Sequence, residues 1–221
     1  MRIRKKPNLA ARLEKCSHLL AVSPESLRGR WLSEFGYETL HVELGCGKGL
    51  FTAETAKAEP DVFIAALEKS ADAMVIATER AAALNLQNIR FINAYADNLT
   101  DYFADGEVSR IYINFCDPWP SNRHAKRRLT CRRFLELYAQ VLAPGGEIHF
   151  KTDNTQLFEY SLREFGLCGF EQAAITRDLH KDAPSGIMTD YELKFHSQGA
   201  PICKCIMRMV TVQRGIREML F

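Results

Sequence analysis

Short apolar segments alternate with helix-like segments along most of this chain, and this order restricts the fold more than any other feature. The segments that we predict as strands are residues 39–44, 61–67, 88–94, 110–115 and 146–151. Between them, apolar residues recur with the helical period of about 3.6 at 49–58, 70–86, 99–105 and 130–143. Because strands that alternate with helices pair in parallel through right-handed crossovers, the pattern predicts a doubly wound α/β sheet with helices on both faces. In such a sheet a ligand binds beyond the carboxyl ends of the strands.

The helix ends and the C-terminal third are predicted from shorter signals. Ser70 and Thr130 are expected as N-caps, and Pro144-Gly145-Gly146 is expected to end the preceding helix with a turn. The later segments are a helix at 155–166, then 171–179, an irregular stretch at 180–186, a short element at 189–195 and a final strand at 201–210. Since no repeat, low-complexity tract or linker interrupts the chain, we expect one domain over residues 1–221, with 1–27 as a basic N-terminal extension.

The composition is that of a globular protein rather than a disordered or membrane-spanning one. Hydrophobic residues make up 47% and charged residues 25% of the chain. No apolar stretch of about 18 residues and no signal-peptide core is present, so we expect no membrane span. The odd number of cysteines, seven, favours reduced thiols and a cytoplasmic location. Cys203 and Cys205 lack a second Cys or His pair at zinc spacing, so we expect small buried thiols and no metal.

The loop after the first predicted strand contains three glycines, Gly45, Gly47 and Gly49, which let the backbone turn tightly and approach a ligand closely. The dinucleotide fingerprint requires a glycine where this chain has Leu50. The Walker pattern requires a glycine where the chain has Val42, and Ser or Thr where it has Gly49. Both phosphate-binding patterns therefore fail, and a plain chain reversal is the alternative to another cofactor.

Two acids favour the cofactor over the plain turn. Glu43 ends the first predicted strand, where a carboxylate opposes a diphosphate and suits an ammonium group. Glu68 ends the second strand, where an acid can accept hydrogen bonds from two ribose hydroxyls. A nucleoside that carries a cationic amino-acid arm and no phosphate fits both, and S-adenosylmethionine is such a ligand. At the end of the third strand, Tyr95 and Asp97 are expected near the adenine, although Asp97 is equally consistent with a solvated loop acid or a helix cap.

The segment "INFCDPWPSNRHAKRR", residues 113–128, places an acid at the tip of the fourth predicted strand and a run of cations directly after it. Pro118 and Pro120 restrict φ, so Asp117 and Trp119 have little freedom. A fixed acid beside a methyl donor predicts a recognition site for the methyl acceptor. Trp119 either stacks on a base or packs inward, and the sequence leaves both open.

Several motifs together resemble the bacterial tRNA (guanine-N7)-methyltransferase family. In order, they are "VELGCGKG", "DPWPSNRHAKRRL", "IHFKTDN", "FEYSL" and "IMTDYELKF". The resemblance runs from about residue 28 to about residue 205. It implies the class I S-adenosylmethionine-dependent fold, a mostly parallel seven-stranded sheet whose last strand is antiparallel. It also implies that the acceptor is a guanine in the tRNA variable loop, with tRNA as the partner. The sequence does not fix whether the chain is a monomer or a homodimer.

By this resemblance, the cofactor site contains Glu43, the three loop glycines, Glu68 and Asp117, and Asp117 is also the catalytic residue. The residues implied to contact RNA are Arg123, His124, Lys126, Arg127 and Arg128. The residues implied to line the guanine pocket are Asp153, Thr189, Asp190, Tyr191 and Glu192. Two positions differ from many family members: Ser121-Asn122 replaces lysines that follow "DPWP", and Tyr95 replaces an acid.

The expected chemistry needs no general base, because guanine N7 already presents an in-plane lone pair. The purine becomes cationic as it accepts the methyl group, so carboxylates near its N1 and N2 hydrogens bind the transition state more strongly. Asp117, Asp153 and Glu192 are the candidates for these carboxylates. The alternatives are an N-cap role for Asp153, and for Glu192 a pair with Lys194 or plain exposure to water.

Other functions remain open from the residues alone. The nearest rival is a methyltransferase that acts on the exocyclic amine of adenine N6 or guanine N2. A non-catalytic RNA-binding relative and a small-molecule methyltransferase are further alternatives. The basic residues 2–6 are expected to form a mobile arm that adds RNA affinity, and residues 28–31 either add a contact or place Trp31 in the core.

Overall fold

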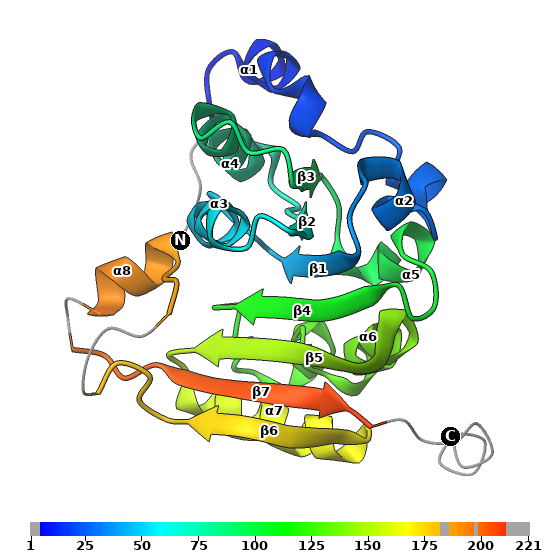
Figure 1. Cartoon of the computed structure of the whole chain (residues 1–221). Coiled ribbons are helices and arrows are strands. Elements are labelled where there is room, and N and C mark those ends of the chain that lie inside the picture. The colour runs from blue at the N-terminus through cyan, green and yellow to red at the C-terminus, as the bar shows by residue number, and fades with distance from the viewer. Residues whose placement is uncertain (1–4, 182–185, 197–198, 211–221) are drawn as a thin grey trace.

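The structure is a computed structural model that describes residues 5–181, 186–196 and 199–210. Its centre is a seven-stranded sheet in the order β3-β2-β1-β4-β5-β7-β6 (Figure 1). The strands are β1 Thr39–Leu44, β2 Val62–Leu67, β3 Ile89–Ile92, β4 Val108–Asn114, β5 Leu142–Thr152, β6 Phe170–Thr176 and β7 Cys203–Met209. The first five pair in parallel, and β7 runs antiparallel to both β5 and β6. The predicted doubly wound, mostly parallel sheet is therefore confirmed.

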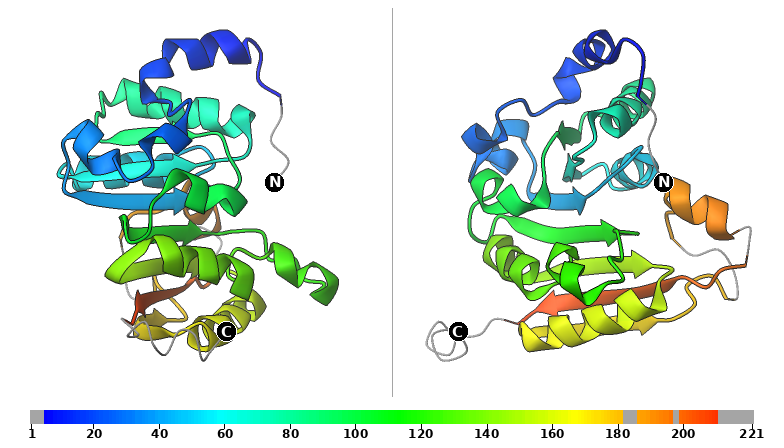
Figure 2. Two further views of the ribbon diagram at one scale, coloured as in Figure 1. Left: turned by 90° about the vertical axis from the view of Figure 1, so that its right-hand side faces the viewer. Right: turned by 180° about the vertical axis from the view of Figure 1, so that it is seen from behind.

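Helices pack on both faces of the sheet. They are α1 Leu9–Lys15, α2 Trp31–Phe35, α3 Leu50–Ala58, α4 Ala71–Ala83, α5 Leu99–Tyr102, α6 Arg132–Val141, α7 Thr155–Leu167 and α8 Asp190–His196. In β2, alternate side chains enter different cores. Phe63 belongs to the core cluster that includes residues of α5, α6 and α7, whereas Ile64 belongs to the one that includes residues of α3 and α4. Figure 2 shows α6 and α7 together on the face that is hidden in Figure 1. This alternation is how a strand buried on both sides joins two layers of helices.

The helix ends differ from the prediction at one cap. Ser70 occupies the N-cap position of α4, although its side chain makes no capping hydrogen bond. The prediction of Thr130 as an N-cap is wrong, because α6 begins after Cys131. The Thr130 hydroxyl lies 2.6 Å from that of Ser161 on α7, so it joins two helices instead. The expected turn at residues 144–146 lies inside β5, where the pairing with β4 is irregular.

Trp31 and the two C-terminal thiols belong to the core. The Trp31 side chain is fully buried, its indole N–H donates to the carbonyl oxygen of Tyr102 at 2.8 Å, and its ring stacks on Phe103. Cys203 and Cys205 are also buried, as expected for small hydrophobic groups. No helix in the described ranges is long and apolar enough to cross a membrane. The predicted basic arm lies mostly outside the described residues, since only Lys5 and Lys6 of it are included.

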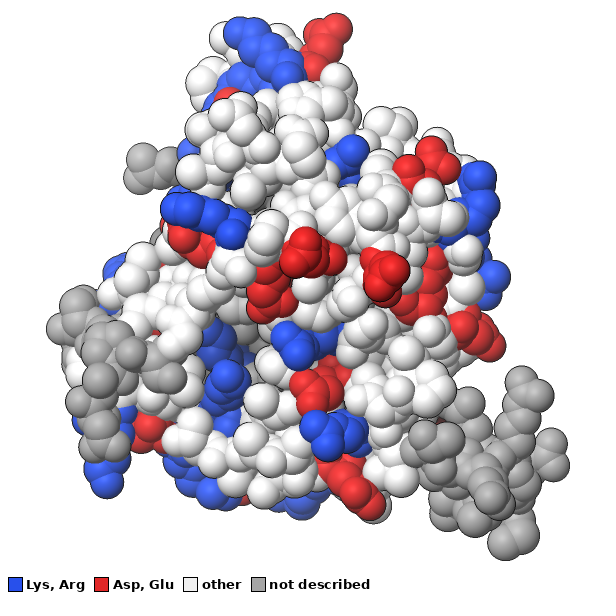
Figure 3. Space-filling view, in the orientation of Figure 1, with Lys and Arg blue, Asp and Glu red and all other residues white. Residues whose placement is uncertain are grey.

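Charged side chains cover the face of β4, β5 and β7 that is turned toward the viewer in Figure 1. Arg110 lies 3.6 Å and Arg208 lies 2.8 Å from the carboxylate of Glu147, which sits between them. Glu171 on β6 is in register with Arg208, and Figure 3 shows positive and negative groups that alternate across this face. Because charged side chains rather than an apolar surface cover it, this part of the sheet can face water without a covering helix.

Candidate active site

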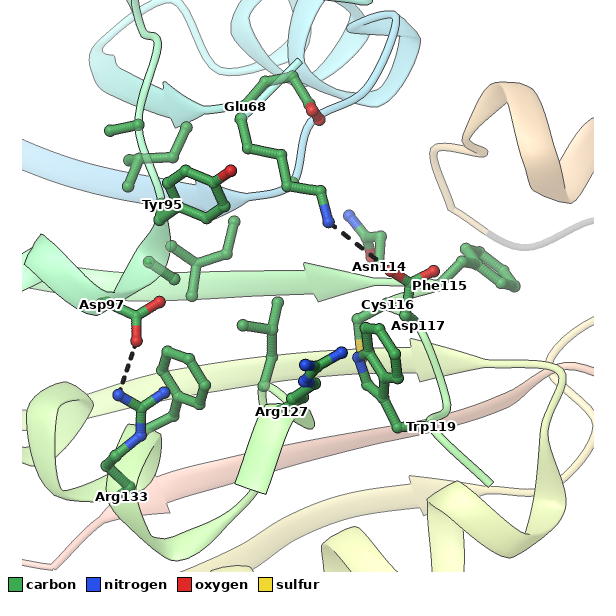
Figure 4. A pocket seen from close by; sticks show the side chains of 18 residues that line it. Glu68, Tyr95, Asp97, Asn114, Phe115, Cys116, Asp117, Trp119, Arg127 and Arg133 are labelled. Atoms are coloured by element: carbon green, nitrogen blue, oxygen red, sulfur yellow. Dashed lines mark ion pairs between the residues drawn. The ribbon is translucent and has the colours of Figure 1, made fainter. Parts of the chain in front are cut away.

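A cavity of about 510 Å³ lies beyond the carboxyl ends of β1 to β4. One lining residue follows the end of each of these strands, respectively Gly45, Glu68, Tyr95 and Asp117. Figure 4 shows Tyr95 at one end of the cavity and Asp117 at the other. Since β1 lies between β2 and β4, the parallel pairing brings these strand ends to one edge of the sheet.

The glycine loop has a backbone that other residues rarely adopt. Gly45, Gly47 and Gly49 have φ values of 75°, 59° and 71°. A Cβ atom added to Gly49 would lie 2.6 Å from the Cβ of Ala77 on α4. Glycine at position 49 therefore allows α3 to start in direct contact with α4, which holds the loop against the second helix.

Glu68 connects the loop after β1 with the start of α4. One of its carboxylate oxygens accepts from the backbone N–H of Gly47 at 2.9 Å, and the other accepts from that of Ser70 at 2.7 Å. The side chain lines the cavity, and each carboxylate oxygen has a second lone pair for a further donor. The position is compatible with the ribose contact predicted from the sequence.

Glu43 is buried beneath the cavity and does not line it. Its carboxylate accepts from the Thr52 hydroxyl at 2.5 Å and from the Asn114 side chain at 3.2 Å. Burial raises the pKa of Glu43 to about 7, and both hydrogen bonds oppose this rise. Asn114 does line the cavity, so Glu43 reaches the site through its hydrogen bond with Asn114, and its contact with a ligand ammonium group stays a prediction.

The turn that carries Asp117 has an unusual backbone at both ends. Phe115 and Trp119 have φ values of 52° and 41°, a region that favours glycine. Backbone strain of this kind is concentrated at functional sites, where the surrounding structure holds it in place. The Asp117 side chain is 68% exposed, and its carboxylate lies 3.8 Å from the Lys69 ammonium group.

Arg128 holds this turn from behind. Its side chain is buried, and its guanidinium donates to the carbonyl oxygen of Pro118 at 3.1 Å and to that of Trp119 at 2.9 Å. The same guanidinium lies 4.3 Å from the ring centre of Tyr160. Arg128 therefore makes these contacts from a buried position and fixes the turn, whereas its neighbours in the predicted RNA-binding set are exposed.

Those neighbours lie on the short helix η4, Asn122–Arg127. The exposed members of the predicted RNA-binding set are Arg123, His124, Lys126 and Arg127. Arg127 also lies 4.8 Å from the ring centre of Trp119, and both residues line the cavity. Half-buried Trp119 thus joins the cavity to the basic helix, which is compatible with stacking on a base.

The opposite end of the cavity contains Tyr95 and Asp97. Tyr95 is 63% exposed, and Asp97 forms an ion pair of 2.6 Å with Arg133 on α6 (Figure 4). The sequence analysis did not assign Lys69 or Asn114 to the site, although both line the cavity. The sequence could have indicated both residues, because Lys69 directly follows Glu68 and Asn114 lies at the end of β4.

Glu192 and Thr189 stabilise the start of α8. Glu192 accepts from the backbone N–H of Thr189 at 3.2 Å, and the Thr189 hydroxyl accepts from the N–H of Glu192 at 2.9 Å, which is a capping box. Glu192 is fully buried and is bound by Lys151 at 2.6 Å and by His180 at 2.8 Å. The alternative in which Glu192 faces water is therefore wrong, and its carboxylate anchors α8 to β5.

Tyr191 brings α8 to the tips of β4 and β5. Its hydroxyl donates to Asp153 at 2.9 Å, and its ring centre lies 5.0 Å from that of Phe115. Burial and the contact with Asp153 raise the pKa of Tyr191 to about 12, so the hydroxyl keeps its proton near neutral pH. The N-cap of α7 is Asn154 and not Asp153, which leaves Asp153 directed toward Tyr191.

Asp190 joins α8 to the glycine loop through Arg80. The Arg80 guanidinium donates to both carboxylate oxygens of Asp190, at 2.9 and 3.0 Å. It also donates to the carbonyl oxygen of Lys48 in the loop at 3.0 Å. The segment predicted to bind the acceptor and the loop predicted to bind the cofactor are thus held by one side chain.

The sheet order and the position of the cavity define the fold of the class I methyltransferases. The 16S rRNA methyltransferase KamB superposes with a TM-score of 0.63 at 17% identity, covering 84% of this chain and 92% of that one. An S-adenosylmethionine-dependent methyltransferase from Aquifex aeolicus gives 0.55 at 15% identity, covering 93% of this chain and all of that one. At these identities the comparison establishes the fold.

Sequence comparison identifies the family. The family model described as "Putative methyltransferase" matches residues 37–205. The tRNA (guanine-N(7)-)-methyltransferase of Geobacillus kaustophilus (strain HTA426) is 46% identical over 207 residues, which are 93% of this chain and 95% of the relative. That of Geobacillus thermodenitrificans (strain NG80-2) is 45% identical, over 93% of this chain and 96% of the relative. The chain belongs to the tRNA (guanine-N(7)-)-methyltransferase family and is an enzyme.

Proposed function

We propose that this enzyme transfers the methyl group of S-adenosylmethionine to N7 of a guanine in the variable loop of tRNA. The observation that supports this most strongly is the place of Asp117. It lines the cavity at the sheet edge, and the exposed cations of η4 follow it within a few residues. The same proposal places the enzyme in the cytoplasm.

The cavity suits a cofactor that is a nucleoside with an amino-acid arm. S-adenosylmethionine supplies a methyl group on a positively charged sulfur atom. In this proposal Glu68 binds the ribose, and the main chain around Tyr95 and Asp97 borders the adenine. Asp117 balances the positive charge of the arm. The methyl group is activated by its own sulfonium, so the proposed reaction includes no metal.

Asp117 and Asp153 have positioning and electrostatic roles in this proposal. The N7 lone pair needs no deprotonation, so neither acid serves as a general base. In this proposal both acids contact the purine as it becomes cationic, so they favour the transition state over the neutral base. Tyr191 orients Asp153 through its hydrogen bond, and Glu192, Thr189 and Asp190 act by holding α8 in place.

The exposed cations of η4 are placed to hold the RNA. Phosphate contacts position a nucleic acid without reading its sequence, and they depend on salt. We assign these contacts to Arg123, His124, Lys126 and Arg127. Together they fix the backbone while a base reaches Asp117.

The test is incubation with unmodified tRNA and labelled S-adenosylmethionine, followed by nucleoside analysis and mapping of the modified position. We expect labelled 7-methylguanosine in the variable loop, and loss of most of the label with Asp117→Asn. A label in N6-methyladenosine or N2-methylguanosine would instead support the exocyclic-amine alternative. Binding of tRNA without any labelled nucleoside would support a non-catalytic RNA-binding protein.

A further inference from the structure

The cavity contains charged side chains of both signs, and most of them are already bound by other protein groups. Among the described residues, those that line it are Glu68, Lys69, Asp97, Asp117, Arg127 and Arg133. Asp97 pairs with Arg133, and Arg127 lies over the Trp119 ring. Both carboxylate oxygens of Glu68 accept backbone N–H groups. Lys69 and Asp117 remain, one cation and one anion that form an ion pair with each other.

The Lys69–Asp117 pair is loose. The ammonium nitrogen lies 3.8 Å from the carboxylate oxygen, and the two side chains are 57% and 68% exposed. A separation of this size is longer than a charge-assisted hydrogen bond. An exposed ion pair contributes little to stability, so a ligand can separate the two groups at little cost.

The two charges match the amino-acid end of S-adenosylmethionine. That end carries an α-ammonium and an α-carboxylate group, one charge of each sign. When it enters, the ammonium group can replace Lys69 beside Asp117, and the carboxylate can replace Asp117 beside Lys69. The ammonium and carboxylate groups together add no net charge, so Lys69 keeps an anionic partner and adds no uncompensated positive charge near the sulfonium.

The surrounding backbone places both groups at the correct end of the cavity. Lys69 lies between Glu68 and Ser70, which are joined by a hydrogen bond of 2.7 Å, so its main chain is fixed. Asp117 lies in the turn that Arg128 holds. Tyr95 is at the opposite end (Figure 4), so a nucleoside with its base there and its ribose at Glu68 directs its amino-acid arm toward Asp117.

Glu43 is the other acid near this arm, and its carboxylate already has protein partners. Its side chain is buried, bound by Thr52 and Asn114, and absent from the cavity lining. The ammonium group therefore meets Asp117. Of the other cations in the described lining, Arg133 pairs closely with Asp97 and Arg127 lies over the Trp119 ring, so the carboxylate meets the loosely paired Lys69.

We propose that Lys69 binds the α-carboxylate of S-adenosylmethionine while Asp117 binds its α-ammonium group. Lys69 thereby selects a complete amino-acid arm over an arm without a carboxylate. This inference rests on the proposed function, because it assumes the same cofactor.

The test is calorimetric titration, without tRNA, of the wild type and of Lys69→Met. The two ligands are S-adenosylmethionine and its decarboxylated form, which keeps the ammonium group and the sulfonium. We expect the wild type to bind the complete cofactor at least about tenfold more tightly, the scale of one charge-assisted hydrogen bond. Lys69→Met is expected to lose most of this preference by weakening only the complete cofactor, and Lys69→Arg to retain part of it.

Lys57→Met is the matched control, since Lys57 is exposed on α3 and does not line the cavity. It is expected to keep the wild-type preference. If Lys69→Met weakens both ligands equally, or neither, the inference is wrong while the proposed function stands. If the wild type binds neither ligand, both fail.

Discussion

Adjacent arginines in the basic segment have different surroundings at the scale of single residues. The Arg127 side chain is exposed beside Trp119, whereas Arg128 is buried and binds two carbonyl oxygens of the turn that carries Asp117. The sequence predicts cations over residues 123–128 but cannot separate these two, because burial depends on the packing of Tyr160 and the proline turn. Glu43 and Leu44 differ in the same way, since alternation along β1 directs only Leu44 into the cavity.

Arg128→Met is expected to lower kcat by at least about tenfold, because small errors in the position of a catalytic group reduce the rate strongly. The affinity for tRNA should change little, since Arg128 is buried. The control Arg127→Met should mainly raise the KM for tRNA, because an exposed cation is lost. Steady-state kinetics on both variants checks this. If Arg128→Met raises KM as much as Arg127→Met does and leaves kcat unchanged, the prediction is contradicted.

Glu43 gives a prediction about pH and stability. The pKa of this carboxyl is about 7 in the folded protein, against a reference value of 4.5. Between these values the folded state keeps the proton and the unfolded chain releases it, so the contribution of Glu43 to stability falls as pH rises through this interval. Glu43→Gln removes the titration. Urea unfolding measures the difference in the free energy of unfolding between Glu43→Gln and the wild type. This difference is expected to shift in favour of Glu43→Gln by up to about 3 kcal/mol between about pH 5 and about pH 8. A constant difference would contradict the assignment.

At the scale of elements, the strands are well predicted and the contacts between elements are not. The apolar segments for β1 to β5 are found within a few residues, because a glycine or a charged residue limits most of them. Thr130 fails as an N-cap because its hydroxyl has a partner on α7, which only the tertiary structure provides. The capping box of Thr189 and Glu192 was available as a sequence pattern, but the burial of Glu192 by Lys151 and His180 was not.

The attachment of α8 to the glycine loop can be tested at Arg80. Arg80→Met removes the bonds to Asp190 and to the Lys48 carbonyl, so the affinities for tRNA and for the cofactor are both expected to fall several-fold. The control is Arg12→Met. Arg12 on α1 makes a similar paired contact with Glu79, which lies on α4 like Arg80, and neither Arg12 nor Glu79 lines the cavity. It should lower only the stability, and only slightly, because an exposed ion pair contributes little. Equal binding constants for the two variants would contradict a role for Arg80 in the site.

At the scale of the whole molecule, the charge distribution matters more than the net charge of +2. One end of the site carries the exposed cations of η4, and the sheet face shown in Figure 3 carries balanced pairs. We therefore expect tRNA to approach over η4 rather than over that face. The sequence predicted the basic segment, but its position beside the cavity required the fold.

The salt dependence of tRNA binding tests this direction. Each phosphate contact contributes about one unit to the slope of log affinity against log salt. Arg123→Gln together with Lys126→Gln is therefore expected to reduce the slope by about two units. The exposed Lys57→Gln on α3 is expected to leave the slope unchanged. An unchanged slope in the double variant would place the RNA elsewhere.

The central claim is that this sheet edge presents a sulfonium methyl group to guanine N7. The most direct measurement compares methyl transfer to two tRNAs that differ only at the target base, guanine in one and 7-deazaguanine in the other. The second base keeps every other hydrogen-bonding group and lacks the N7 lone pair. We predict about one methyl group per molecule on the first tRNA and none on the second. Equal transfer to both would contradict the account.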